Sequence, residues 1–206
     1  MSALRTLAVS VSLIVLGLVT LAVATDHFRA FTSETARRIE VREHPRPVPP
    51  VTLESQTGAR FKLSGLQGKW LVVDFIYTRC VTLCSVLGGK FAQLQEQLTT
   101  PLAQHRVQLL SISFDPERDT PAQLADYLER FRSHGEGWLA GRPLDAQGLE
   151  ALKRTFGVTV VPDNAGGYVH NDAFAIVDPQ GRLVNILDSD APAYSVGDTV
   201  LRYLNP

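Results

Sequence analysis

The stretch LVVDFIYTRCVTLCSVLGGKFAQLQEQL, residues 71–98, contains both cysteines of the chain. Its first seven residues are apolar except for Asp74 and rich in β-branched and aromatic side chains, which is typical of a short buried strand. From Ser85 onward, apolar residues recur every three or four positions, and this spacing predicts a helix with one apolar face. We therefore expect a central strand that turns directly into a helix, with both thiols at that turn.

The two cysteines, Cys80 and Cys84, are four residues apart. If the helix begins near Cys80, the thiols lie one turn apart on the same face and can share one small ligand. A helix N-terminus lowers the pKa of a cysteine placed there, and the thiolate is both a nucleophile and a soft metal ligand. A disulfide closing so short a loop adds little stability, so we predict a chemical site rather than a structural bridge.

Two thiolates leave a transition metal under-coordinated, so a third donor is needed from elsewhere in the fold. Among the five histidines, His170 is the candidate, because it stands at the entrance of an apolar, strand-like run, residues 173–177. The others precede the domain or lie in polar loops: His27, His44, His105 and His134. From the residues alone, an ordinary histidine at a strand edge remains the alternative.

Three motifs occur in order: YTRC-x-x-x-C after an apolar strand, then FDPERDTP, then a histidine followed by seven residues and DPQGR. This set resembles the Sco/SenC copper-binding proteins of the thioredoxin superfamily over roughly residues 51–187. The resemblance implies a thioredoxin-like domain in which Cys80, Cys84 and His170 are the ligands of one copper ion, Cu(I) or Cu(II). It also implies delivery of copper to the dinuclear copper centre of a respiratory oxidase.

The chain departs from the family pattern at Val81 and Ser85, where the family usually has proline. Without these prolines, two backbone N–H groups are available and the turn is less rigid. We expect this difference to change the metal affinity and not the set of ligands. A structural zinc site is less well supported, because it normally uses four protein ligands.

The same thiols allow a second function, that of a thiol–disulfide oxidoreductase acting on another extracytoplasmic thiol protein. Cys80 and Cys84 would then be a redox-active pair that cycles between dithiol and disulfide. Three intervening residues are less typical of thioredoxin-like oxidoreductases, which favours a copper-binding assembly protein over an enzyme. A redox or copper sensor is a third possibility, for which the sequence contains no partner motif.

The amino-acid composition limits the class of protein and the kinds of partner. The chain has 206 residues, of which 45% are hydrophobic and 20% charged, with a formal net charge of -1. Such a chain can bury one substantial core and is not expected to be disordered. The near-neutral balance and the lack of a long Lys/Arg run argue against nucleic acid as a partner.

The N-terminal segment contains an uncharged, Leu/Val-rich run at residues 7–24 that is just long enough to span a bilayer. Arg5 precedes this run, which favours an N-terminus in the cytoplasm and a domain on the extracytoplasmic, periplasmic side. The run is longer than a typical signal peptide core, so we favour a retained anchor over a cleaved signal peptide. We expect an anchor at 1–25, a proline-rich stalk at 26–50 and a thioredoxin-like copper-binding domain at 51–206.

The rest of the chain alternates strands and helices, which predicts an α/β sheet with crossover connections. The expected elements are an N-terminal hairpin (51–53 and 60–63), strands at 107–114, 174–177 and 183–187, and helices at 120–131, 145–156 and 195–204. Asp119 or Thr120 should cap the second helix, so Asp119 is interpreted as a cap rather than a catalytic carboxylate. Asp115 helps to shape the strand-end site, and the glycine-rich loop 161–169 is expected to be the most mobile segment.

Overall fold

The computed structural model describes residues 3–25, 32–80, 83–163 and 166–205 of the chain. These residues form two compact units, Met1–Glu43 and His44–Pro206. The helices are α1 (Ala3–Ala24), α2 (Ser33–Glu43), the 3-10 helix η1 (Leu63–Leu66), α3 (Leu83–Gln97), α4 (Thr99–Ala103), α5 (Pro121–Arg130), α6 (Ala146–Phe156) and α7 (Ala193–Leu204). The strands are β1 (Arg46–Pro47), β2 (Thr52–Ser55), β3 (Arg60–Lys62), β4 (Trp70–Ile76), β5 (Val107–Ser113), β6 (Trp138–Pro143), β7 (Val160–Pro162), β8 (Tyr168–His170), β9 (Ala173–Val177) and β10 (Arg182–Asp188).

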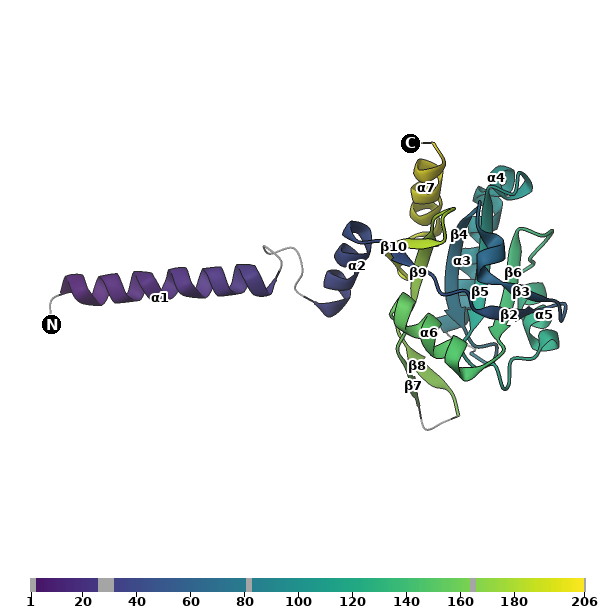
Figure 1. The fold of residues 1–206 in the computed structure, drawn as a ribbon, viewed down its shortest axis with the longest axis horizontal. Helices are drawn as coiled ribbons and strands as arrows, with labels where there is room; N and C mark the ends of the chain where they lie inside the picture. The colour runs from purple at the N-terminus through teal and green to yellow at the C-terminus, as the bar shows by residue number, and fades with distance from the viewer. Residues whose placement is uncertain (1–2, 26–31, 81–82, 164–165, 206) are drawn as a thin grey trace. The chain divides into compact units, whose positions relative to one another are not determined.

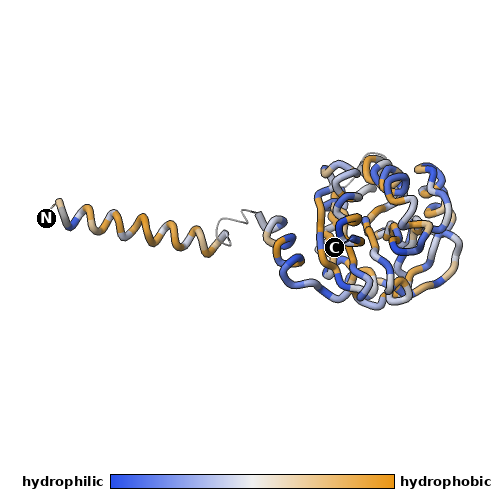
Figure 2. The backbone as a smooth tube through the Cα atoms, turned by 90° about the horizontal axis from the view of Figure 1, so that it is seen from above, coloured by the Kyte–Doolittle hydropathy of each residue, from blue (hydrophilic) through white to orange (hydrophobic). Residues whose placement is uncertain are grey.

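The first unit consists of the helices α1 and α2. The segment Arg5–Ala24 of α1 has a mean hydropathy of 2.6 and is long and apolar enough to cross a membrane, a property that signal sequences share. Figure 2 shows that this helix is apolar along nearly its whole length. In α2, which is polar, Arg37 and Arg38 both pair with Glu34. The predicted N-terminal apolar segment is therefore a helix, and its retention as an anchor stays a prediction.

The second unit is built on an eight-stranded mixed sheet with the strand order β1-β10-β9-β4-β5-β6-β2-β3. The strands β4, β5 and β6 run parallel, whereas β9 runs antiparallel to β4 on its other side. The parallel strands place their C-terminal ends at one edge of the sheet. The N-terminal end of β9 lies at that same edge, because an antiparallel strand begins where its neighbour ends.

Helices cover both faces of the central strands (Figure 1). Val72 and Ile76 of β4 belong to a core that side chains from α3, α5 and α7 complete. Phe75 points to the opposite face, where its ring centroid lies 5.2 Å from that of Phe156 in α6. Burial on both faces explains why β4 and β5 are mostly apolar without a strict alternation of apolar and polar residues.

The predicted α/β fold with an N-terminal hairpin is confirmed. The hairpin joins β2 to β3, with Leu53 opposite Phe61, and β2 also pairs with β6. The proline-rich stretch before it contains β1, in which Arg46 lies opposite Leu183 of β10. Part of the expected stalk therefore adds a short strand to the edge of the sheet.

Three local expectations need correction. The helix α3 begins at Leu83, so Cys80 precedes the helix instead of starting it. The strand β6 was not predicted, because its sequence WLAGRP contains glycine, arginine and proline among few apolar residues. The expected glycine-rich loop contains two antiparallel strands, β7 and β8, in which Val161 lies opposite Val169. Residues 164–165 lie outside the described part of the chain.

Candidate metal centre

The cysteine turn follows β4 directly. After the strand ends at Ile76, the chain turns so that the Cys80 N–H donates to the Tyr77 carbonyl oxygen at 3.2 Å. Cys80 is 5% exposed. Its sulfur is therefore sheltered within the domain, as a thiol must be if it is to bind a metal ion away from bulk water.

The second cysteine is only partly described. Cys84 lies in the first turn of α3, but the side chains of residues 81–85 fall outside the described part of the chain. Among the side chains that are described, no three from His, Cys, Asp and Glu lie close enough together to hold one metal ion. The pairing of Cys80 with Cys84, and the effect of the two missing prolines on the turn, stay predictions.

His170 lies at the same edge of the sheet as the cysteine turn. The pairing of β9 with β4, with Val73 opposite Ala175, brings the start of β9 beside the end of β4. The ring centroid of His170 lies 4.7 Å from that of Phe114 and 6.2 Å from that of Tyr77. These two aromatic residues stand at the ends of β5 and β4. His170 is buried between the strand ends rather than being a solvated histidine.

Sequence reasoning missed a neighbour of His170. The Nδ1 atom of His170 lies 2.7 Å from Oδ1 of Asp172, and both side chains are almost fully buried. The only signal in the sequence is an aspartate two residues after the histidine, which a strand would place on the same side. Such a pattern is too common to be informative before the fold is known.

Asp119 joins two strand ends and is not the helix cap. Thr120 caps α5, in a capping box with Gln123. The buried carboxylate of Asp119 accepts hydrogen bonds from the Thr78 N–H at 3.1 Å, the Thr78 hydroxyl at 2.7 Å and the Ser113 hydroxyl at 2.5 Å. Burial raises the pKa of Asp119, and these hydrogen bonds oppose the shift. Of the two expected caps, Thr120 is confirmed. Asp119 is not the cap, because its carboxylate accepts hydrogen bonds from Thr78 in the cysteine turn and from Ser113.

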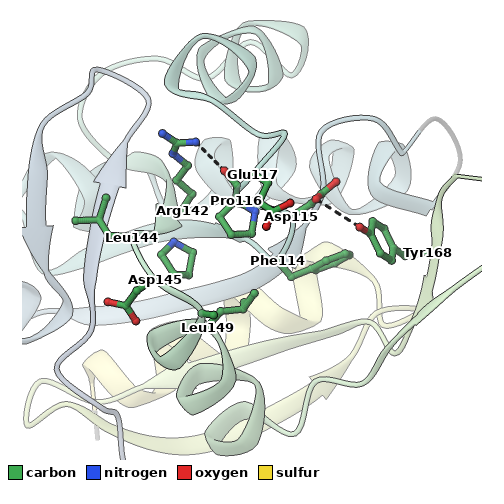
Figure 3. A pocket seen from close by; sticks show the side chains of 11 residues that line it. Phe114, Asp115, Pro116, Glu117, Arg142, Leu144, Asp145, Leu149 and Tyr168 are labelled. Atoms are coloured by element: carbon green, nitrogen blue, oxygen red, sulfur yellow. Dashed lines mark hydrogen bonds between the residues drawn. The ribbon is translucent and has the colours of Figure 1, made fainter.

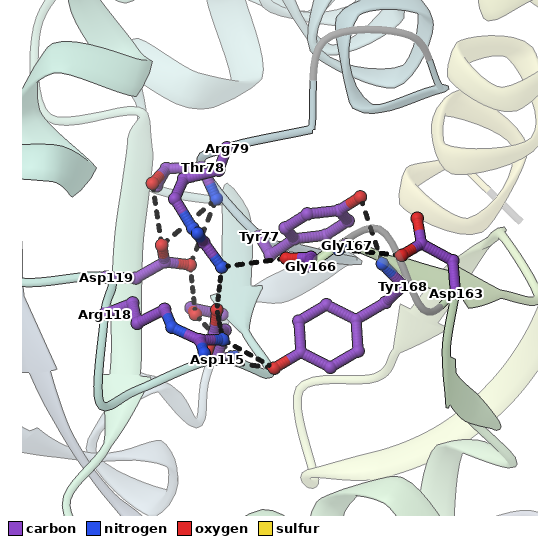
Figure 4. A network of polar contacts seen from close by, with 11 residues as sticks. Tyr77, Thr78, Arg79, Asp115, Arg118, Asp119, Asp163, Gly166, Gly167 and Tyr168 are labelled. Carbon is purple, nitrogen blue, oxygen red and sulfur yellow. Dashed lines mark hydrogen bonds and ion pairs between the residues drawn. The ribbon is translucent and has the colours of Figure 1, made fainter.

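Asp115 connects the three segments around the site, which fits its expected role at the strand end. Its Oδ2 atom lies 3.4 Å from both Arg79 Nη2 and Arg118 Nη1, and its Oδ1 accepts from the Tyr168 hydroxyl at 3.4 Å. Arg79 also donates to the Gly166 carbonyl oxygen at 3.3 Å. Figure 4 shows how these contacts tie the cysteine turn, the end of β5 and the β7–β8 hairpin to one another.

A cleft of about 480 Å³ opens beside this network. Phe114, Asp115 and Tyr168 line it together with Leu149 of α6, whose side chain lies next to Phe114 in Figure 3. Because the Phe114 ring also packs on His170, a group bound in this cleft would be separated from His170 by a single side chain.

The match to known families covers most of the chain, because the model of the SCO1/SenC family aligns with residues 40–205. The chain belongs to the SCO1/SenC family. Among its relatives, the SCO1 protein homolog of Bacillus subtilis is 29% identical over 139 residues, which cover 66% of this chain and 71% of that protein. The mitochondrial SCO1 homolog of Homo sapiens is 23% identical over 162 residues, or 76% of this chain and 52% of the human protein. The resemblance predicted from the motifs is confirmed.

Solved structures of Sco proteins share this fold. A SCO1/SenC family lipoprotein from Bacillus anthracis has a TM-score of 0.70 at 23% identity, covering 79% of this chain and 98% of its own. Yeast Sco1 with copper bound has a TM-score of 0.64 at 23% identity, covering 78% and 89%. BsSco, described as a member of the Sco family of cytochrome c oxidase assembly proteins, has a TM-score of 0.66 at 24% identity, covering 77% and 94%. The thioredoxin-like fold of the second unit is confirmed.

This SCO1/SenC protein also has a buried carboxyl group beneath α3. Asp74 lies between Val72 and Ile76 in β4, so its side chain points to the face that α3 covers. Burial raises the pKa of Asp74 to about 7, and the charge of Asp172 adds to the rise. Ser111, opposite it in β5, lowers the pKa only in part, since neither carboxyl oxygen makes a hydrogen bond of good geometry with a described residue.

We expect Asp74→Asn to remove much of the pH dependence of stability between about pH 4 and pH 7. In this window the folded state keeps a proton on Asp74, whose pKa is about 7 instead of 3.8, while the unfolded state loses it. The free energy of unfolding of the wild type therefore falls as the pH rises, by at most about 4 kcal/mol from this group. Above about pH 7 both states are ionised and this contribution is constant.

Urea denaturation of the second unit at about pH 4.5 and pH 8 measures this difference. The loss of stability at the higher pH should be clearly smaller in Asp74→Asn than in the wild type, and Asp119, whose pKa is also raised, contributes to the loss that remains. Asp126→Asn, which removes an exposed carboxyl group on α5, should behave as the wild type does. An Asp74→Asn protein with the wild-type loss would show that the Asp74 carboxyl group titrates normally.

Proposed function

We propose that this protein binds one copper ion through Cys80, Cys84 and His170 and delivers it to the copper centre of a respiratory oxidase. The observation that carries this proposal is the antiparallel pairing of β9 with β4, because it brings His170 to the strand ends that lead into the turn of Cys80. Two thiolates and one imidazole are soft and intermediate donors that suit copper in both oxidation states. Copper is thus the cargo of this site.

Family membership supports the same conclusion. Yeast Sco1 has been solved with copper bound, and BsSco is described as a member of a family of cytochrome c oxidase assembly proteins. The residues around the site also suit a copper ion that is passed on to a partner protein. Cys80 is buried, and His170 is buried beside the rings of Tyr77 and Phe114. We propose that a partner protein approaches the site from the cleft beside Phe114.

We place the domain on the extracytoplasmic side of a membrane, tethered by α1. The supporting observations are the apolar segment of α1, which is exposed over its length, and the position of Arg5 before it. A positive charge at the start of such a helix favours the cytoplasm for the N-terminus. The oxidase subunit that receives the copper would then lie in the same membrane.

A second candidate function uses the same thiols to reduce a disulfide of an extracytoplasmic partner. One thiolate attacks the partner disulfide, the other cleaves the mixed disulfide, and the pair ends as a Cys80–Cys84 disulfide while the partner gains two electrons and two protons. The solved structure of BsSco concerns a disulfide switch.

We expect the reduced full-length protein in detergent micelles to bind close to one copper ion per chain and the oxidised protein to bind almost none. A disulfide removes both thiolate donors at once. Anaerobic titration with Cu(I) against a chromogenic chelator, followed by metal analysis of the desalted protein, measures the stoichiometry. Re-reduction of the oxidised sample is the control and should restore binding.

Equal binding by the oxidised and the reduced protein would exclude the thiols as ligands and overturn the proposed site. A reduced protein that binds no copper but transfers electrons to a partner disulfide would establish the second candidate function instead.

A further inference from the structure

The imidazole ring of His170 is held from several sides. Its Nδ1 atom lies 2.7 Å from Oδ1 of Asp172, and the side chains of His170 and Asp172 are 2% and 4% exposed. The rings of Phe114 and Tyr77 meet the imidazole at 64° and 76°, in edge-to-face arrangements. A buried ring in such contacts has little freedom to rotate about its side-chain bonds.

The backbone between His170 and Asp172 is held as well. The Asn171 side chain accepts a hydrogen bond from the Thr159 N–H at 2.7 Å and donates one to the Gly157 carbonyl oxygen at 2.9 Å. These contacts fasten the connection from β8 to β9 against the segment that follows α6. His170 and Asp172 therefore keep their relative positions through the backbone and through the side-chain contact.

We infer that Asp172 is a positioning residue of the copper site, an inference that rests on the proposed function. Nδ1 and Oδ1 lie within hydrogen-bonding distance, at 2.7 Å. In the copper-bound site the Asp172 carboxylate would accept a hydrogen bond from the Nδ1–H of His170, and this bond would select the imidazole tautomer whose lone pair is on Nε2. Nε2 is then the atom that binds copper, and the hydrogen bond fixes the direction in which it points. A carboxylate in this role also strengthens the imidazole as a donor, and the loss of such a partner typically costs about 10–100-fold in metal affinity.

The contact has a consequence for the two oxidation states. Cu(I) is soft and accepts two-coordinate thiolate binding, whereas Cu(II) prefers additional nitrogen donors. Because Asp172 acts through His170, its removal should affect Cu(II) more strongly than Cu(I). A carboxylate that merely satisfies a buried histidine in the fold would show no such difference.

The test compares full-length wild-type, Asp172→Asn and Asp172→Ala proteins in detergent micelles, loaded with Cu(II). Asn retains the volume and an oxygen acceptor but removes the charge, and Ala removes both. Glu117→Gln is the matched control, since it removes one exposed carboxylate close to the cleft without touching His170. Circular dichroism verifies that each variant is folded.

Two measurements are needed. Competition with chelators should show Cu(II) affinity reduced by roughly 10–100-fold in Asp172→Ala, less in Asp172→Asn, with Cu(I) changed by under about tenfold. Pulsed EPR detects the imidazole nitrogen remote from the copper, which is Nδ1 if Nε2 is the ligand. Its nuclear quadrupole frequencies should shift in both Asp172 variants, because they depend on the hydrogen bond at that nitrogen, and should be unchanged in Glu117→Gln.

Wild-type frequencies and wild-type Cu(II) affinity in both Asp172 variants would overturn this inference and leave the copper site itself intact. A wild-type spectrum without imidazole modulation would overturn the copper site and this inference together. If Asp172→Ala fails to fold, Asp172→Asn decides the matter through the same frequencies and affinities.

Discussion

Replacing Cys80 or Cys84 by serine should abolish tight copper binding in both oxidation states, while His170→Ala should weaken Cu(II) far more than Cu(I). A serine hydroxyl stays protonated near neutral pH and is a hard oxygen donor, so it does not replace a thiolate at a soft ion. We expect either cysteine substitution to lower the affinity by at least about 1,000-fold, or about 4 kcal/mol. Loss of the imidazole leaves two thiolates, which are sufficient for Cu(I) and insufficient for Cu(II).

Competition titrations with one chelator for each oxidation state measure these affinities on the reduced full-length protein. His44→Ala is the matched control, because His44 is exposed and precedes β1, and it should bind both ions as the wild type does. A His170→Ala protein with wild-type affinity for Cu(II) would remove His170 from the ligand set. The thiol–disulfide function would then be the better account of the two cysteines.

Asp119→Ala should lower the free energy of unfolding by about 3–5 kcal/mol, because it leaves buried donors without their acceptor. The substitution removes the acceptor of the Thr78 N–H and of the Thr78 and Ser113 hydroxyls, all of which are buried. Thr78 stands two residues before Cys80, so the loss also loosens the cysteine turn. We therefore expect weaker Cu(I) binding in addition to lower stability.

Urea denaturation of the second unit, monitored by circular dichroism, measures the stability change. Asp119→Asn should lower the free energy of unfolding by less than Asp119→Ala does. The amide oxygen of Asn can still accept from Thr78, and the Ser113 hydroxyl oxygen can accept from the new NH2 group. Glu117→Ala, an exposed carboxylate in the same connection, should change stability by under about 0.5 kcal/mol. An Asp119→Ala protein as stable as Glu117→Ala would mean that water or neighbouring groups satisfy the released donors.

The strands and helices that sequence reasoning located are those with a strong local pattern. The mostly apolar run of β4, the helical spacing of α3 and the start of α5 near Thr120 each depend on residues a few positions apart. The strand β6 has no such pattern and is held by its pairing with β5 and β2, which lie far away in the sequence. Its existence is a property of the sheet and not of its own residues.

The sequence by itself determined the family, the strand–turn–helix that carries the cysteines and the residue types able to bind copper, because periodicity and motif order are local properties. Only the tertiary structure decided that His170 lies at the strand ends beside the cysteine turn, since this depends on the direction of β9 relative to β4. It also decided that Asp119 bonds to Thr78, 41 residues away, instead of capping α5. A side chain acquires its hydrogen-bond partners and loses its contact with solvent only when distant segments pack together. For that reason the raised pKa of Asp74 and the contact of Asp172 with His170 could not be predicted from the sequence alone.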